Sequence, residues 1–274
     1  EAGLDLTTGS ENVAIGYRSL YEATTAVQNT AFGSQTLRNT TSNNNTALGY
    51  LALTANTSGT GTAVGSFALY SNTTGAANVA VGGFDGTTYS ALNANTTGSY
   101  NVAVGTGALQ DNTTASNNVA VGYKASYLNT TGYYNAALGN FALEDTTTGA
   151  ANTALGYNTL ANNTTGNNNV AVGVSALAAN TTTSQLVAVG AYALRVNTAP
   201  GNTAIGTYSM YDNTTGQKNT AVGESSLENN TTGQHQVSVG YHSLLNNSTG
   251  SYNTAVGYGA LRANTTGGEN TAVG

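Results

Sequence analysis

The chain has 274 residues, of which only 7% are charged, and its formal net charge is −6. The charged fraction lies far below the roughly 25% of ordinary globular proteins, and the six Lys and Arg never occur in a run, which excludes the clustered basic surface of a nucleic-acid binder. The absence of Cys excludes disulfides and thiolate metal sites, and no apolar run approaches the roughly 20 residues that span a bilayer.

One motif of about 17 residues repeats from end to end: Asn-Thr-Ala-Val-Gly, then Tyr-x-Ala-Leu, then Asn-Thr-Thr-Gly. A fixed period of this length is typical of a solenoid. Residues 1–11 match the second half of one repeat, and the last repeat stops at its fifth residue. The recurring Gly of the motif stands at Gly16, Gly33, Gly49, Gly65, Gly82, Gly105, Gly122, Gly139, Gly156, Gly173, Gly190, Gly206, Gly223, Gly240, Gly257 and Gly274. The spacing falls to 16 three times and rises to 23 once, after Gly82.

The first five residues of each repeat predict a short strand. We number every repeat from its Asn, so that Asn253 is position 1 and Gly257 is position 5. Position 2 is Thr or Val in fifteen of sixteen repeats, position 3 is Ala in fifteen, and position 4 is always apolar. These are strand-forming residues, so strands are expected from 13–16 through 271–274.

Both faces of these strands are apolar. Because side chains alternate along a strand, positions 2 and 4 face one way and the Ala at position 3 faces the other. The small Ala fits a narrow interior, and the larger side chains are expected to pack on a neighbouring chain or on the opposite wall. The interchange of Thr and Val at position 2 also predicts burial there.

The rest of each repeat predicts a narrow coil. A second apolar pair at positions 8 and 9, such as Ala108-Leu109, leaves room for about two short strands and two turns. Asn-Thr-Thr-Gly has turn chemistry, since Gly supplies positive φ and Asn bonds its local backbone. Stacked Asn and Thr are expected to form side-chain ladders. Outside the long repeat, charged residues avoid positions 2–5, 8 and 9.

The Asn-[Thr/Val]-Ala-[Val/Ile/Leu]-Gly core resembles the head repeats of trimeric autotransporter adhesins, the YadA-like heads. The full motif is also similar to arrays in phage tail-fibre and other surface-fibre proteins. The resemblance covers essentially the whole chain, although adhesin heads typically use a shorter period. It implies a left-handed parallel β-roll with three chains side by side on the exterior of a cell or virion.

The repeat pattern predicts an all-β fold: a parallel β-solenoid, as a narrow β-roll of about sixteen 17-residue turns. The resemblance implies that this β-roll is left-handed and trimeric. Residues 1–274 are expected to be a single repeat array without caps at either end, as a segment of a longer fibre. The expected partners are copies of the chain itself, in a trimer or a longer filament, together with a host surface or glycan receptor. Neither cofactor, metal, nucleic acid nor membrane contact is expected in this segment.

The 23-residue repeat carries an insertion at 83–89 that breaks the regular surface. Unique loops on repeat scaffolds often bind ligands, and a merely tolerated insertion is the alternative. The candidate binding residues are Phe84, Asp85, Thr87, Thr88 and Tyr89.

The Asn-Thr-Thr element matches the N-glycosylation sequon, although turn formation explains the same residues without a glycan. The candidate glycosylation sites are Asn39, Asn72, Asn95, Asn112, Asn129, Asn163, Asn180, Asn213, Asn230 and Asn264.

Two further groups are weaker candidates. Position 6 carries a column of Tyr that is expected to stack on sugars or, with more support, to pack between turns or chains: Tyr17, Tyr50, Tyr123, Tyr157, Tyr241 and Tyr258. His235 and His242 are the only histidines, and without a nearby acid they predict surface display rather than a metal site.

The function that the sequence favours is structural: a segment of an extracellular fibre or adhesin head that forms a stiff trimeric rod for surface display or attachment, and not an enzyme. One alternative is an ice- or surface-binding solenoid, motivated by Thr columns at positions 2, 13 and 14. Another is a glycan-degrading tail fibre. That activity needs clustered acids, and the only paired carboxylates, Glu144-Asp145, are sequence neighbours that point apart on a strand.

Overall fold

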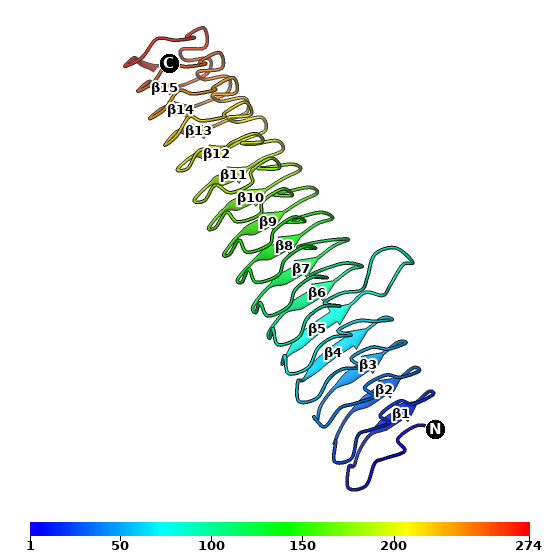
Figure 1. The fold of residues 1–274 in the computed structure, drawn as a ribbon. Coiled ribbons are helices and arrows are strands. Elements are labelled where there is room, and N and C mark those ends of the chain that lie inside the picture. The colour runs from blue at the N-terminus through cyan, green and yellow to red at the C-terminus, as the bar shows by residue number, and fades with distance from the viewer. The chain divides into compact units, whose positions relative to one another are not determined.

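The computed structural model describes residues 1–274 and consists of short strands joined by turns, without a helix (Figure 1). The strands are β1 (Val13–Ile15), β2 (Thr30–Phe32), β3 (Thr46–Leu48), β4 (Gly61–Val64), β5 (Asn78–Val81), β6 (Val102–Val104), β7 (Val119–Val121), β8 (Ala136–Leu138), β9 (Thr153–Leu155), β10 (Val170–Val172), β11 (Val187–Val189), β12 (Thr203–Ile205), β13 (Thr220–Val222), β14 (Val237–Val239), β15 (Thr254–Val256) and β16 (Thr271–Val273). Each covers positions 2–4 of a repeat, and β4 and β5 also include position 1, so the predicted all-β parallel solenoid is confirmed.

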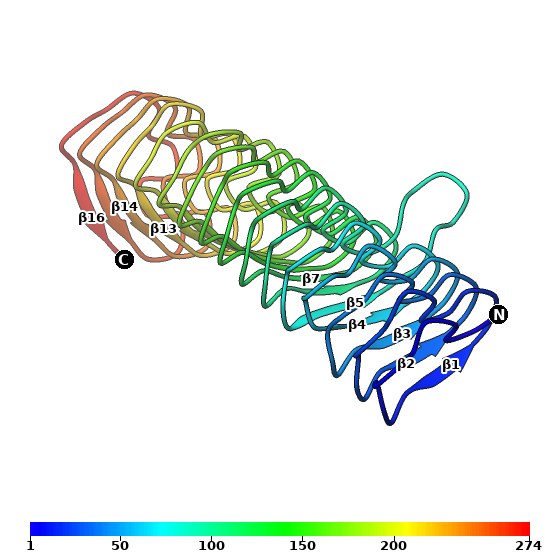
Figure 2. The same cartoon turned by 60° about the horizontal axis from the view of Figure 1, so that its bottom comes forward.

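The chain forms two compact units. Unit 1 comprises Glu1–Phe141 and Thr146–Thr148, with strands β1–β8, and unit 2 comprises Ala142–Asp145 and Gly149–Gly274, with strands β9–β16. Within each unit the strands pair in parallel with the strands before and after them, in the register of the repeat (Figure 2). Ala103 thus pairs with Ala120 in unit 1, and Ala171 with Ala188 in unit 2.

The interior of each coil lies between the strand and the apolar pair at positions 8 and 9. Ala103, Ala108 and Leu109 of one coil are all fully buried. The side chains at positions 2 and 4 point outward instead: Val119 is 44% and Leu138 is 50% exposed. Packing against the opposite wall and burial at position 2 were therefore wrong for the single chain. The narrow interior accepts only the Ala side of the strand.

The second strand expected in each coil does not form. Positions 7 and 9 adopt left-handed backbone conformations, as at Tyr192 (φ 61°) and Leu194 (φ 49°), and these are incompatible with an extended chain. The backbone still bonds neighbouring coils, since Leu194 N–H donates to the Ser209 carbonyl at 3.0 Å. A hydrogen-bonded ladder therefore runs along this side without regular strand geometry.

Buried Asn side chains form the predicted ladders at positions 1 and 12. At position 12, Asn112 donates through Nδ2 to Asn95 Oδ1 at 2.7 Å and to the Ala115 carbonyl at 3.1 Å. At position 1, Asn118 Nδ2 donates to the Gly132 carbonyl, and Asn118 N–H donates to Asn101 Oδ1. Because the coils are nearly identical, most of these amides satisfy the next one, as buried polar groups require. The position-12 ladder is interrupted at Thr146 and after Asn180, where Asn129 Oδ1 and Asn180 Oδ1 have no donor.

The Gly at position 5 recurs because the coils approach too closely for a side chain. Gly173 has φ 123°, a conformation that L-residues rarely adopt, and a Cβ built there would lie 2.7 Å from the carbonyl oxygen of Gly190. The backbone ladder therefore needs Gly at this corner. The structure contains no helix of the length and apolarity needed to cross a membrane.

Candidate functional site

The outer face of the sheet carries, in each unit, a column of apolar side chains at position 4 and a column at position 2 that mixes Val with Thr, which occupies position 2 in eight of the sixteen strands. In unit 1 the exposed apolar side chains include Val13, Ile15, Phe32, Leu48, Val81, Val119 and Leu138, and in unit 2 Leu155, Val170, Ile205, Val237, Val256 and Val273. At the usual strand spacing, eight three-residue strands cover about 40 Å by about 10 Å, on the order of 400 Å². Apolar patches of this size mark interaction surfaces on soluble proteins.

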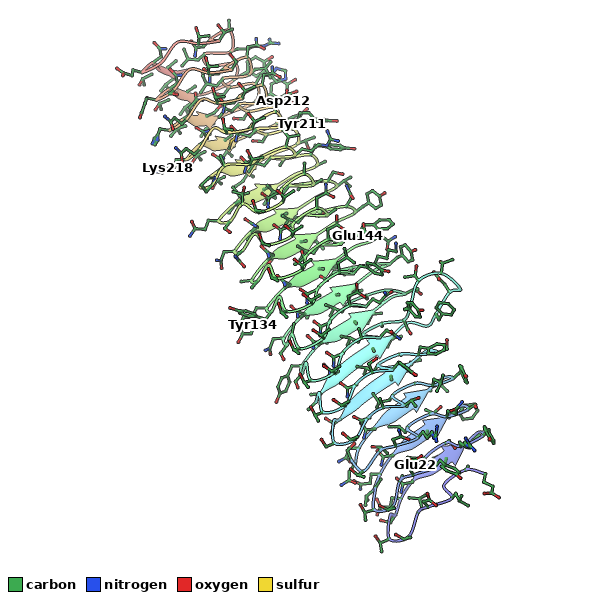
Figure 3. The ribbon with its side chains drawn as sticks, in the orientation of Figure 1. Glu22, Tyr134, Glu144, Tyr211, Asp212 and Lys218 are labelled. Carbon is green, nitrogen blue, oxygen red and sulfur yellow. The ribbon has the colours of Figure 1, made fainter.

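Charged side chains stand beside this face rather than on it. Arg38 and Glu22 form an ion pair of 3.1 Å between positions 10 and 11 of successive coils. In unit 2, Lys218 extends from one edge of the coils, and Tyr211 and Asp212 extend from the opposite edge (Figure 3). The outer face of each sheet is therefore uncharged along its length.

The insertion at 83–89 projects from the regular coils of unit 1 as an ordered loop (Figures 1 and 2). Asp85 Oδ1 accepts hydrogen bonds from Thr87 N–H at 2.9 Å, Thr87 Oγ1 at 3.0 Å and Thr88 N–H at 2.6 Å. The backbone donor of Thr88 and then that of Thr87 lower the pKa of the Asp85 carboxyl. The loop thus holds a solvent-exposed negative charge at a fixed place.

The five predicted loop residues do not all face the same way. Phe84 and Tyr89 remain exposed, at 39% and 52%, with their ring centroids 5.4 Å apart. Thr88 is buried, and its hydroxyl shares a hydrogen bond of 3.2 Å with the hydroxyl of Tyr123. The structure therefore brings two rings together at the surface, leaves the neighbouring Asp85 exposed, and uses Thr87 and Thr88 to shape the loop.

Sequence reasoning did not predict the group of aromatic side chains on the neighbouring coils against which this loop packs. Phe67 contacts Tyr50 (5.4 Å between centroids), Tyr70 (5.6 Å) and Phe84 (6.0 Å), each edge-on. We call Tyr50, Phe67, Tyr70, Phe84 and Tyr89 the aromatic cluster. The signal in the sequence is that Phe67 and Phe84 both occupy position 7, in consecutive coils.

Most of the candidate glycosylation sites are the rungs of the position-12 ladder. Eight of them are fully buried: Asn72, Asn95, Asn112, Asn129, Asn163, Asn180, Asn213 and Asn230. In Asn95, for example, Nδ2 donates two hydrogen bonds inside the coil, so a glycan on this atom has no room in the folded chain. Asn39 and Asn264 are half-buried, and glycosylation there stays a prediction.

Asn39 differs from the other candidate sites because the Asn-Thr-Thr element begins one position earlier in its repeat. It stands at position 11, and Thr40 takes the ladder position, where its hydroxyl accepts a hydrogen bond from Asn56 Nδ2 at 3.2 Å. The same Asn-Thr-Thr element therefore occurs at two different structural positions, with its Asn at position 11 in one repeat and at position 12 in the others.

The position-6 tyrosines pack along the coils while keeping exposed surface. Tyr241 stacks on Tyr258 with centroids 5.4 Å apart, and Tyr123 meets Phe141 edge-on at the same distance. Tyr258 is nevertheless 74% exposed. Contact between coils is thus present in this column, and sugar stacking stays a prediction.

The two histidines lie in different columns and contact different rings. His235 meets Tyr252 edge-on at 5.1 Å, whereas His242 stacks on Tyr241 at 3.7 Å. No group of three or more His, Cys, Asp or Glu side chains is placed to hold a metal ion.

Comparisons with protein-family models, with curated proteins and with solved structures found no match.

Proposed function

We propose that the chain is a segment of a structural fibre on the exterior of a cell or virion, similar to an adhesin head or tail fibre. Three copies lie side by side in a stiff rod that serves display or attachment. The observation that carries this proposal is the uncharged outer face, with its apolar column at position 4, along β1–β8 and again along β9–β16. The number three rests on the resemblance of the motif to trimeric adhesin heads.

A second copy of the chain is the occupant that fits this face best. Its strands carry the same side chains at the same spacing of about 4.8 Å, so the columns of one copy interdigitate with those of another. A standard interface buries about 800 Å² per partner, and each unit offers on the order of 400 Å² of flat face. The absence of charge from positions 2–4 means that no unpaired charge is buried on association.

The ladders support the mechanical part of the proposal. Within each unit, every coil is tied to the next by backbone hydrogen bonds on the strand and corner sides and by Asn amides inside, as between Asn95 and Asn112. Bending a unit stretches the bonds on its convex side and compresses those on its concave side, and many bonds resist at once. Stiffness therefore follows from repetition rather than from one large core.

The native mass tests the proposal. We expect sedimentation equilibrium to give three times the chain mass of 27.5 kDa. Val119→Glu puts a charge on the outer face of β7, where Val119 is already 44% exposed, so it should dissociate the assembly while the strand content seen by circular dichroism persists. Thr114→Glu, at an exposed turn position, is the matched control. A folded monomer at every concentration contradicts the proposal.

A second candidate is binding to ice or another crystalline surface. Position 2 was expected to be buried, but Thr30, Thr46, Thr153 and Thr220 point outward from their strands, so regular rows of hydroxyl and methyl groups face solvent. Thermal hysteresis at micromolar concentration that Thr153→Tyr abolishes would support this function. A freezing point that depends only on the solute concentration, without a gap between freezing and melting, would exclude ice binding.

A further inference from the structure

The chain repeatedly places its own cations over tyrosine rings. Arg18, at position 7, has its guanidinium carbon 5.1 Å from the ring centroid of Tyr17 and 5.2 Å from that of Tyr21. Lys124, also at position 7, has Nζ 5.6 Å from Tyr123 and 4.9 Å from Tyr127. In both coils, rings at positions 6 and 10 thus flank a cation at position 7, an attractive geometry.

The aromatic cluster shares part of this arrangement: its coil keeps the ring at position 10, has Ser66 instead of a ring at position 6, and has Phe67 in place of the cation. Phe67 stands at position 7, and Tyr70 stands at position 10 of the same coil. The insertion then adds Phe84 and Tyr89, and Asp85 follows Phe84 directly. More rings gather here than around Arg18 or Lys124, and the charge within the loop is the negative charge of Asp85.

Charge complementarity therefore points to a cation from outside the chain. We propose that the aromatic cluster and Asp85 bind a small organic cation, a quaternary ammonium group of the kind found in choline. The exposed faces of Phe84 and Tyr89 meet its methyl groups, and the carboxylate of Asp85 faces its charge. The inference goes beyond the proposed function, because every residue of this site lies in one chain and the site needs no second copy.

The choice of a cation without N–H groups follows from the hydrogen-bond acceptors. The chain's own cations have acceptors: Arg195 Nη1 donates to the hydroxyl of Tyr211 at 2.7 Å, and Arg38 Nη2 donates to Glu22 Oε1 at 3.1 Å. Phe67 and Phe84 offer none. The hydroxyls of Tyr50, Tyr70 and Tyr89 lie at the ring edges rather than on the ring faces. Asp85 Oδ1 already accepts three hydrogen bonds from its own loop. A quaternary ammonium, which needs no acceptor, matches the ring faces and the negative charge of this site.

The fixed carboxylate also distinguishes among the ligands that bind to aromatic rings. Nucleotides and acidic sugars carry negative charge, which Asp85 repels. A neutral saccharide stacks on rings without using the charge, so its binding is insensitive to Asp85→Asn. The two classes of ligand are therefore distinguishable by one substitution that retains the side-chain oxygen on which the loop's hydrogen bonds converge.

The test is a titration with choline chloride, followed by the ring-proton NMR shifts of Phe84 and Tyr89. The neutral isostere 3,3-dimethyl-1-butanol and the neutral saccharide cellotetraose are titrated in parallel. We expect millimolar saturation with choline and about two- to fivefold weaker binding of the isostere, the difference that exposed cation–π contacts supply. Asp85→Asn should weaken choline binding about threefold at low salt and less at high salt.

A deletion provides the control for folding. Removing residues 84–89 leaves Gly83 followed by Ser90 and restores a 17-residue repeat, so this variant should keep the strand signal and lose the choline response. Tyr258→Ala, at an exposed ring of unit 2, should leave binding unchanged. Equal binding of choline and its isostere, preference for cellotetraose, or retention of choline binding after the deletion would each overturn the proposal.

Discussion

Asn230 donates through Nδ2 to Oδ1 of Asn213, one coil earlier in the sequence, at 2.6 Å. Asn213 in turn donates to Asn197 Oδ1 at 2.7 Å and to the carbonyl of Gly216 at 2.9 Å. All three Asn are fully buried. A residue that the sequence presents as part of a turn is therefore the polar centre of the coil, and each amide depends on its neighbours.

Asn213→Ala should lower the free energy of unfolding of the chain by about 3 kcal/mol, because the buried Nδ2 of Asn230 loses the acceptor Asn213 Oδ1, and the Asn197 Oδ1 keeps only the donor of Asn202. Asn162→Ala, at an exposed position, is the control and should change it by less than about 0.5 kcal/mol. Urea denaturation followed by circular dichroism measures both. Equal midpoints for the two variants would show that the ladder contributes no stability.

Gly173→Ala should be more damaging. The φ of 123° adds strain of about 2 kcal/mol, and the new Cβ meets the backbone of Gly190, which adds about 2 kcal/mol of overpacking. Gly86→Ala separates the two effects, since Gly86 has φ 100° with nothing within 4 Å of the added atom. Thermal melting should place the Gly86 variant between the wild type and the Gly173 variant.

Ala77→Gly should stabilise unit 1. Ala77 is exposed and has φ 54°, a left-handed conformation that costs an L-residue about 1 kcal/mol and Gly almost nothing. Ala55→Gly, at a half-buried position outside the left-handed set, should instead destabilise by about 0.5 kcal/mol. We expect a higher melting temperature than that of the wild type for the Ala77 variant and a lower one for the Ala55 variant. Lower melting temperatures for both variants would contradict the argument from the left-handed backbone.

Acid should loosen the insertion loop selectively. The donors of Thr88 and Thr87 hold the pKa of Asp85 below its ordinary value of 3.8, so the ionised carboxylate stabilises the folded loop above that pH. This stabilisation is lost as the pH falls from about 4 through the lowered pKa of the folded state. The protection factors of the Thr87 and Thr88 amides in hydrogen–deuterium exchange, after correction for the intrinsic rate at each pH, should fall over this range in the wild type and stay constant in Asp85→Asn.

The sequence predicts the strands well and the corners poorly. Residues 102–104, Val-Ala-Val before a Gly, have the composition of a strand, and burial of Ala103 follows from alternation. Leu109 is different, since its left-handed φ of 50° is unusual for Leu and no local residue preference indicates it. Burial of Leu109 inside a stacked coil overrides the backbone preference, and this is a property of neighbouring coils rather than of the local sequence.

The candidate site divides in the same way. The break in period locates the loop that carries Phe84 and Tyr89, and loop composition explains the hydrogen bonds of Asp85. The contact between Tyr50 and Phe67 depends on which columns meet when coils stack, and that offset is visible only in three dimensions. At Asn95 the sequence suggests a glycosylation site, but the buried side chain cannot be one. The sequon is a local motif and carries no information about burial.

The left-handed corners also bear on how the chain reaches its structure. One coil of unit 2 holds Ser175, Leu177 and Gln185 at φ of 54°, 53° and 63°, at roughly 1–2 kcal/mol each. A lone coil has no neighbour to offset this, so it is unfolded in isolation. Folding must begin with a nucleus of several coils that form together. The solenoid then grows by the addition of one coil at a time at either end of the nucleus.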